Sequence, residues 1–305
     1  MKYLLILFFL FNCGLSHAQA QPNSVYIVLS SDQEIYQQAS TLIQNNLALL
    51  ADSSDKNIYL IDDFLVDAAS TRNINPNDLI VTVGDKSAKK IHSLGLKNPV
   101  IYAFSEKNII YGMTQLKTVK PWAALVINQP LQRLVSIADH LVSDSYKNKI
   151  IIAVSEKNAF ALKEIEALHP LNNGVLKVIK VPESKLASKL AKDDFFNAGA
   201  LVALHDNEVW SGKSANLLLY QAFNYKVPVI GYSKKFLTAG ALLSVFSPIE
   251  NIANHTATHI NHWSITGTLK ETGIIYSSAS IDVNPNIARV LHLPISDLEP
   301  LTNED

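Results

Sequence analysis

The sequence predicts an α/β protein with two Rossmann-like lobes, each built on a parallel sheet covered by helices. Short runs of consecutive apolar residues alternate with stretches in which apolar residues recur at helical spacing. The alternation forms two series of similar size, over residues 25–104 and 131–231, on either side of a stretch without clear periodicity from Ser105 to Pro130. A chain of 305 residues is long enough for one large domain or two ordinary ones.

The first series predicts four strands that are apolar along their whole length. Such runs are typical of a parallel sheet with helices on both faces. Ser30, Ser31 and Asp32 follow the first run and are good N-cap residues for the helix after it. The four runs cover residues 25–29, 57–61, 79–84 and 100–104.

The second series repeats this pattern, and a shorter tail follows it. Strands are expected at 149–154, 175–181, 200–204 and 227–231, with helices at 131–142, 159–168 and 214–223. The tail adds a strand at 242–246, a helix at 249–263, a strand near 274–276 and a short helix from Pro285. It is too short for a third lobe, so we expect it to return to the first lobe and then cross to the second. The predicted division is 24–125 plus 246–274 for the first lobe and 126–245 plus 275–302 for the second.

The N-terminus predicts export. A positive start is followed by a short apolar run and by Ala-Gln-Ala at 18–20, so residues 1–20 are expected to be a signal peptide. The apolar run is well below the ~20 residues that a spanning helix needs. Lipid attachment at Cys13, the only cysteine, is the less favoured alternative, because the residues before it are not small. We therefore expect a periplasmic protein.

The charge balance excludes two classes of partner. The formal net charge is −1 at pH 7, whereas nucleic acids and anionic membrane surfaces select a basic face. We therefore expect no nucleic-acid partner.

Two motifs invite a chemical interpretation that their context does not support. Ser-Gly-Lys-Ser at 211–214 ends like a phosphate-binding loop but lacks its first glycine and the strand before it. His255, His259 and His262 share a helix face, and two of them at i, i+4 could hold zinc, but Thr256 stands where a metalloprotease needs glutamate. No Gly-x-Ser-x-Gly turn is present. We therefore expect no enzyme, no catalytic residues, no metal site and no cofactor, and an exported α/β hydrolase is the minor alternative.

Several segments, in their order, carry a family resemblance. They are residues 78–88, 99–104, 203–207, 226–231 with 240–244, and 282–294. With these the chain resembles the substrate-binding proteins of ABC transporters related to tryptophan and tyrosine uptake. The resemblance implies the type I periplasmic binding protein fold, in which a multi-crossing hinge joins the lobes. Two positions depart from the family pattern: Ser105-Glu106-Lys107 replaces an Asp-Pro, and Asp85-Lys86 replaces a Thr-Pro or Thr-Ala.

Ligands of open parallel sheets bind beyond the carboxyl ends of the strands, beside helix N-termini. Hydroxyl and N–H groups there could hold a carboxylate, Asp206 or Asp85 an ammonium group, and an aromatic ring such as Tyr102, Phe104 or Trp210 an apolar side chain. The predicted ligand-binding residues are Ser31, Asp85, Ser87, Ser105, Ser155, Asp206, Asn207 and Tyr232.

The predicted function is capture of a small polar or amphipathic solute, amino-acid-like by resemblance, between the two lobes. The closed form would deliver the solute to a membrane ABC permease. Two alternatives remain open: a ligand-sensing partner of a membrane sensor kinase or cyclase, and a scaffold that has lost its ligand.

Overall fold

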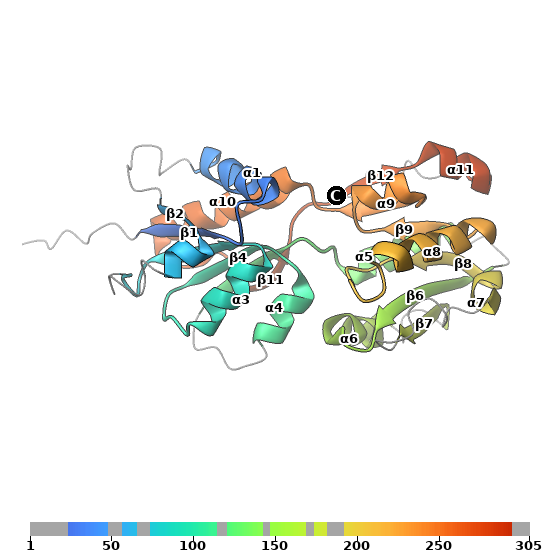
Figure 1. The fold of residues 1–305 in the computed structure, drawn as a ribbon, viewed down its shortest axis with the longest axis horizontal. Helices are drawn as coiled ribbons and strands as arrows, with labels where there is room; N and C mark the ends of the chain where they lie inside the picture. The colour runs from blue at the N-terminus through green and yellow to red at the C-terminus, as the bar shows by residue number, and fades with distance from the viewer. Residues whose placement is uncertain are drawn as a thin grey trace, which may run out of the picture.

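The computed structural model describes residues 24–47, 57–65, 74–114, 121–142, 147–168, 174–181 and 192–294, which form two α/β lobes side by side (Figure 1). The predicted signal peptide, with Cys13, and the C-terminal residues 295–302 assigned to the second lobe lie outside the described residues.

The first lobe contains a six-stranded parallel sheet in the order β11-β5-β4-β3-β1-β2. Alternate residues of each strand face opposite sides. In β1, Val25, Ile27 and Leu29 pack with α1 and α10, whereas Val28 packs with α3 and α4. The strands are β1 (Val25–Leu29), β2 (Asn57–Leu60), β3 (Leu79–Val83), β4 (Val100–Ser105), β5 (Trp122–Val126) and β11 (Gly273–Tyr276), and the helices α1 (Glu34–Asn45), α3 (Asp85–Ser93), α4 (Lys107–Thr114) and α10 (Ile249–Thr266).

The second lobe repeats this architecture with a sheet in the order β12-β10-β9-β8-β6-β7. One face is covered by α5, α6 and α11 and the other by α7, α8 and α9. The strands are β6 (Lys149–Ser155), β7 (Leu176–Val181), β8 (Ala198–Val202), β9 (Val229–Gly231), β10 (Leu243–Phe246) and β12 (Ser280–Val283), and the helices α5 (Leu131–Val142), α6 (Ala159–Leu168), α7 (Lys192–Phe196), α8 (Gly212–Asn224), α9 (Lys234–Ala239) and α11 (Pro285–Leu291).

The predicted two-lobed α/β fold is confirmed, with two corrections. The stretch from Ser105 to Pro130 is not irregular, because it contains α4 and β5, a further βα unit of the first lobe. The second sheet is not purely parallel, because β12, which the sequence did not predict, pairs antiparallel with β10.

The predicted lobe boundaries fall inside three strands. Val126 and Tyr276 pair with each other in the first sheet, since β5 and β11 run on to these residues. Phe246 pairs with Ser280 in the second sheet. The hydrogen-bonded register therefore moves each boundary by one or two residues.

Three connections between the lobes meet in one place. They follow β5, β10 and β11, and the buried side chain of Gln129 joins them. Its Nε2 donates to Ser247 Oγ (2.5 Å) and to the carbonyl of Ser277 (3.0 Å), and Ser247 Oγ donates to the same carbonyl (3.2 Å). The three connecting segments of the hinge are thus linked to one another by side-chain hydrogen bonds.

Candidate functional site

A cleft of about 1000 Å³ lies between the lobes. Its walls come from the carboxyl ends of β4, β8 and β9, where the parallel-sheet rule places ligands. The first lobe contributes Phe104 and Glu106, and the second contributes His205, Asn207 and Tyr232. The volume suits a small molecule with contacts to both lobes.

Glu106 is the acidic group at the centre of this arrangement. Its backbone N–H donates to Asp85 Oδ1 (3.0 Å), and Asn207 of the opposite lobe lines the same cleft. Burial and the nearby negative charge of Asp85 raise the pKa of Glu106 to about 7. The cleft therefore contains a carboxyl group whose pKa lies near neutral pH.

His205 and Tyr232 form an aromatic wall in the second lobe. Their ring centroids are 3.9 Å apart, and the ring of Phe236 lies 4.6 Å from that of Tyr232. Burial and the positive charge of Lys107 lower the pKa of His205 to about 3, so its imidazole is neutral at physiological pH. This wall is suited to an apolar or aromatic group rather than to an anion.

Phe104 supplies an apolar surface from the first lobe. Its φ angle is 57°, in the left-handed region that non-glycine residues rarely adopt. The register between β4 and β5 shifts at this position, between Ala103 and Ser105. Backbone strain of this kind is concentrated at functional sites.

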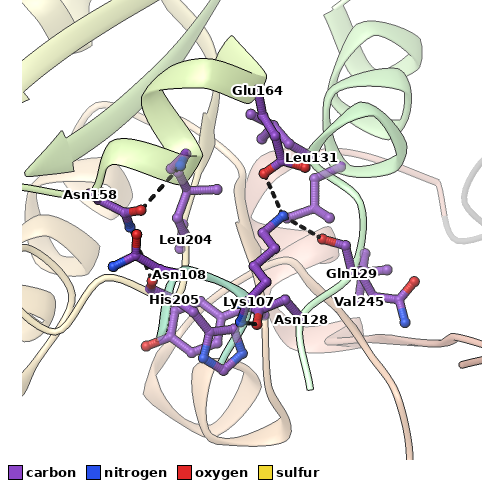
Figure 2. Close-up of a pocket in the computed structure, with 14 residues that line it drawn as sticks. Lys107, Asn108, Asn128, Gln129, Leu131, Asn158, Glu164, Leu204, His205 and Val245 are labelled. Carbon is purple, nitrogen blue, oxygen red and sulfur yellow. Dashed lines mark hydrogen bonds and ion pairs between the residues drawn. The ribbon is translucent and has the colours of Figure 1, made fainter. Parts of the chain in front are cut away.

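A smaller pocket of about 20 Å³, with room for one water molecule, shares His205 and Tyr232 with the cleft (Figure 2). Lys107 of α4 crosses it to pair with Glu164 Oε2 of α6 (2.5 Å) and with the carbonyl of Gln129 (3.3 Å). Because α4 and α6 belong to different lobes, this ion pair holds the lobes together beside the hinge.

The family model for ABC transporter substrate binding protein matches residues 64–286. The chain belongs to this family. Substrate-binding proteins of ABC transporters bind small-molecule solutes and are not enzymes, which confirms the predicted family and the absence of catalysis. The family is typically extracytoplasmic, and among the described residues no helix has the length and apolarity to cross a bilayer.

Solved structures of such proteins share the fold. This substrate-binding protein is similar to an ABC domain in complex with L-Trp from Streptococcus pneumonia, at 19% identity and a TM-score of 0.59 over 90% of this chain and 98% of that one. It is similar to the ligand-free, open structure of a substrate-binding protein with adhesive properties from Clostridium difficile, at 14% identity and 0.67 over 89% and 95%. A periplasmic ribose ABC transporter structure from Conexibacter woesei matches at 11% identity and 0.56 over 92% and 97%. No curated protein matches the sequence.

Two of the predicted ligand-binding residues, Asn207 and Tyr232, line the cleft of the substrate-binding protein. Two neighbouring ones turn inward instead. The Asp206 carboxylate, 4% exposed, accepts hydrogen bonds from Ser155 N (2.8 Å), Glu208 N (3.2 Å) and Asn158 Nδ2 (3.3 Å). Ser155 is buried, and its hydroxyl accepts from Lys157 N (3.1 Å). These side chains accept hydrogen bonds from backbone N–H groups of the loops after β6 and β8.

The predicted residues of the first lobe lie around the cleft rather than on its wall. Ser87 is fully buried and bonds to Ser30 Oγ (3.1 Å), and Ser105 is buried beside Asp85. Ser31 Oγ accepts from a backbone N–H two residues on, as turn residues do. Asp85 is half-buried and supports the backbone of Glu106.

Of the aromatic residues considered from the sequence, Phe104 and Trp210 line the cleft. Trp210 Nε1 donates to the carbonyl of Ala153 (3.1 Å), which fixes the ring. Tyr102 is buried, and its hydroxyl lies 3.3 Å from His92 Nδ1. Glu106 and His205 were not predicted, although His205 directly follows a predicted strand and Glu106 lies two residues after another.

Proposed function

We propose that this substrate-binding protein captures a small amphipathic solute with an ammonium group, such as an amino acid, and delivers it to an ABC permease from the periplasm. The observation that carries the proposal is the placement of Glu106 in a cleft that Asn207 of the opposite lobe and the aromatic side chains of Phe104 and Tyr232 also line. An ammonium group would favour the ionised form of Glu106, because its attraction to the carboxylate would offset the repulsion from Asp85.

The opposite side of the cleft suits the carboxylate of such a solute. The first turn of α8 lines the cleft with Gly212, Ala215 and Asn216. The first N–H groups of a helix lack intrahelical partners, and the helix dipole favours an anion there. Lys234 and Lys235 add positive charge to the same wall.

An apolar side chain fits between the remaining groups. Phe104 comes from the first lobe, and Tyr232 and Phe246 come from the second. Since these contacts come from both lobes, the solute would stabilise the closed arrangement over the open one. Closure is the signal that a permease can recognise.

A thermal-shift screen of the purified protein against L-amino acids, sugars, inositols and nucleosides tests the proposal. A solute at 100 times its dissociation constant should add about 2.7 kcal/mol of stability. We expect the hits to carry an α-ammonium group, and Glu106→Gln to weaken their binding by about tenfold or more, as loss of a charge-assisted bond does. Glu166→Gln removes an exposed carboxylate of α6 and should have no effect. A tight hit from a sugar, unaffected by Glu106→Gln, would overturn the proposal.

A further inference from the structure

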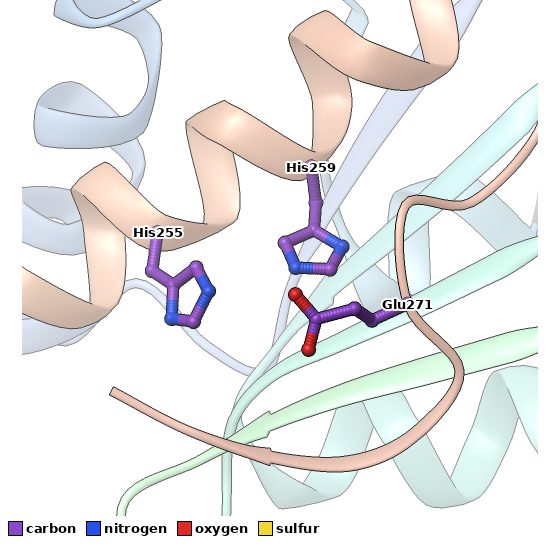
Figure 3. A group of neighbouring side chains, drawn as sticks. All are labelled: His255, His259 and Glu271. Atoms are coloured by element: carbon purple, nitrogen blue, oxygen red, sulfur yellow. The ribbon is translucent and has the colours of Figure 1, made fainter. Parts of the chain in front are cut away.

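Three potential metal ligands meet on the first lobe, outside the cleft. His255 and His259 stand one turn apart on α10, and Glu271 reaches toward them from the segment before β11 (Figure 3). One ligand atom of each residue lies within 4.8 Å of the others. Among the described residues this is the one such group of three. None of them lines the cleft.

His259 is the most unusual member of the group. Its side chain is fully buried, yet neither ring nitrogen has a hydrogen-bond partner within the described part of the chain. Buried polar atoms are nearly always partnered, because the loss of water otherwise costs free energy. The fully buried imidazole of His259 therefore lacks the partner that burial favours, and a metal ion would supply one.

His255 already has the outer contact that metal-binding histidines use. Its Nδ1 lies 3.2 Å from Ser277 Oγ, which leaves Nε2 free for coordination. Hydrogen bonds of this kind fix the tautomer and the ring orientation of ligands.

We propose that His255, His259 and Glu271 form a binding site for Zn²⁺, with water in the fourth position. Two imidazoles and a carboxylate are ligands that zinc accepts, whereas Mg²⁺ and Ca²⁺ select oxygen alone. Tetrahedral zinc ligands lie about 3.4 Å apart, so the group must contract slightly. The exposed Glu271 side chain can make that movement by rotation, and the exposed edge of the group gives the ion access.

Such a site would tie α10 to the segment that enters β11. Ser277, the outer partner of His255, also offers its carbonyl to Gln129 of the hinge. The ion would therefore stiffen the first lobe next to the connections between the lobes. It requires no solute, so this inference stands apart from the proposed function.

The test is a titration of chelator-stripped full-length protein with ZnCl₂ by calorimetry, with CoCl₂ as a spectroscopic probe and MgCl₂ as the ion that should not bind. We expect one Zn²⁺ per chain and a visible cobalt band typical of tetrahedral coordination. Glu271→Gln should weaken zinc binding by about 100-fold, since loss of even an outer partner costs 10–100-fold. His259→Leu should abolish it while the metal-free protein remains as stable as the original, because the two orphan nitrogens are removed.

His262→Ala is the matched control, since His262 is on the same helix but outside the group. It should bind zinc as the original protein does. Equal binding by Glu271→Gln and the original protein, or no binding at all, would overturn the proposal. If His259→Leu does not fold, the exposed Glu271 variant still decides. Solute binding measured in parallel should be unchanged by Glu271→Gln, which separates this result from the fate of the proposed function.

Discussion

Single residues of the cleft show why its ligand set is harder to predict than its location. The rule that ligands bind after parallel strands pointed to the loops that contain Asn207 and Tyr232. It could not tell which side chain of a loop faces the cleft. Asp206 and Ser155 turn inward because loop N–H groups after β6 and β8 need acceptors. Glu106 was noted only as a departure from the family pattern, yet it occupies the cleft.

The carboxyl group of Glu106, which we propose binds the solute, lowers the stability of the fold when it is ionised. Its pKa in the folded protein is about 7, above the usual value of 4.5. The protonated group stabilises the fold at low pH, and this contribution is lost as the pH rises toward 7. We expect Glu106→Gln to raise the melting temperature by an amount that grows between pH 4.5 and 7 and is constant above that range. Thermal unfolding from pH 4.5 to 8.5 measures it.

A control separates the charge from the substitution itself. Glu166→Gln, on an exposed position of α6, should give the same small difference in melting temperature at every pH. If Glu106→Gln also gave a difference that does not depend on pH, the Glu106 carboxyl would have its ordinary pKa in the folded protein.

At the scale of elements, strands were predicted well where the sequence has a continuous apolar run. Elements in segments of mixed composition were missed. The runs that became β1 and β3 contain mostly valine, isoleucine and leucine, and the run that became β4 also contains Tyr102 and Phe104. In β5, Ala123 and Ala124 dilute the signal, although both are fully buried. In α4, Gly112 interrupts the helical pattern. The histidines of α10 could be recognised from their helical spacing. Glu271 could not, because it lies beyond the helix and only the fold brings it close to them.

The turn from β3 to α3 shows how one residue fixes two elements. Gly84 has a φ angle of 92°, and a Cβ atom there would lie 2.5 Å from Tyr36 Cε1 and 2.7 Å from Ser30 Oγ. Gly84→Ala should therefore destabilise the protein by about 2–5 kcal/mol, the sum of the strain at a positive φ angle and overpacking. Urea unfolding measures the loss.

Gly95→Ala is the comparison for that prediction. Gly95 also has a positive φ angle, of 64°, but no atom lies within 4 Å of the place where its Cβ would be. Gly95→Ala should therefore lower the free energy of unfolding by the backbone strain alone, about 1–2 kcal/mol. Equal losses for the two variants would show that the contacts with Tyr36 and Ser30 do not determine this turn.

At the scale of the whole molecule, the two-lobed architecture followed from the two βα series and the short tail. The number of connections between lobes followed from the tail as well, because it could not form a lobe of its own. The hydrogen bonds that tie these connections could not be predicted. Gln129, Ser247 and Ser277 are far apart in sequence and come together only when the chain is folded.

Gln129 should therefore set the freedom of the lobes to move. Gln129→Leu keeps the size of the side chain but removes its bonds to Ser247, Ser277 and Arg133. We expect a stability loss of about 1–3 kcal/mol, a larger radius of gyration by solution X-ray scattering without solute, and weaker solute binding. Weaker binding follows because a smaller share of molecules has the lobes in the binding arrangement. Gln132→Leu, on an exposed position of α5, should change none of these. If Gln129→Leu lost stability while its scattering and solute affinity stayed the same, Gln129 would serve packing alone, and the lobes would be oriented by the contacts between α4 and α6.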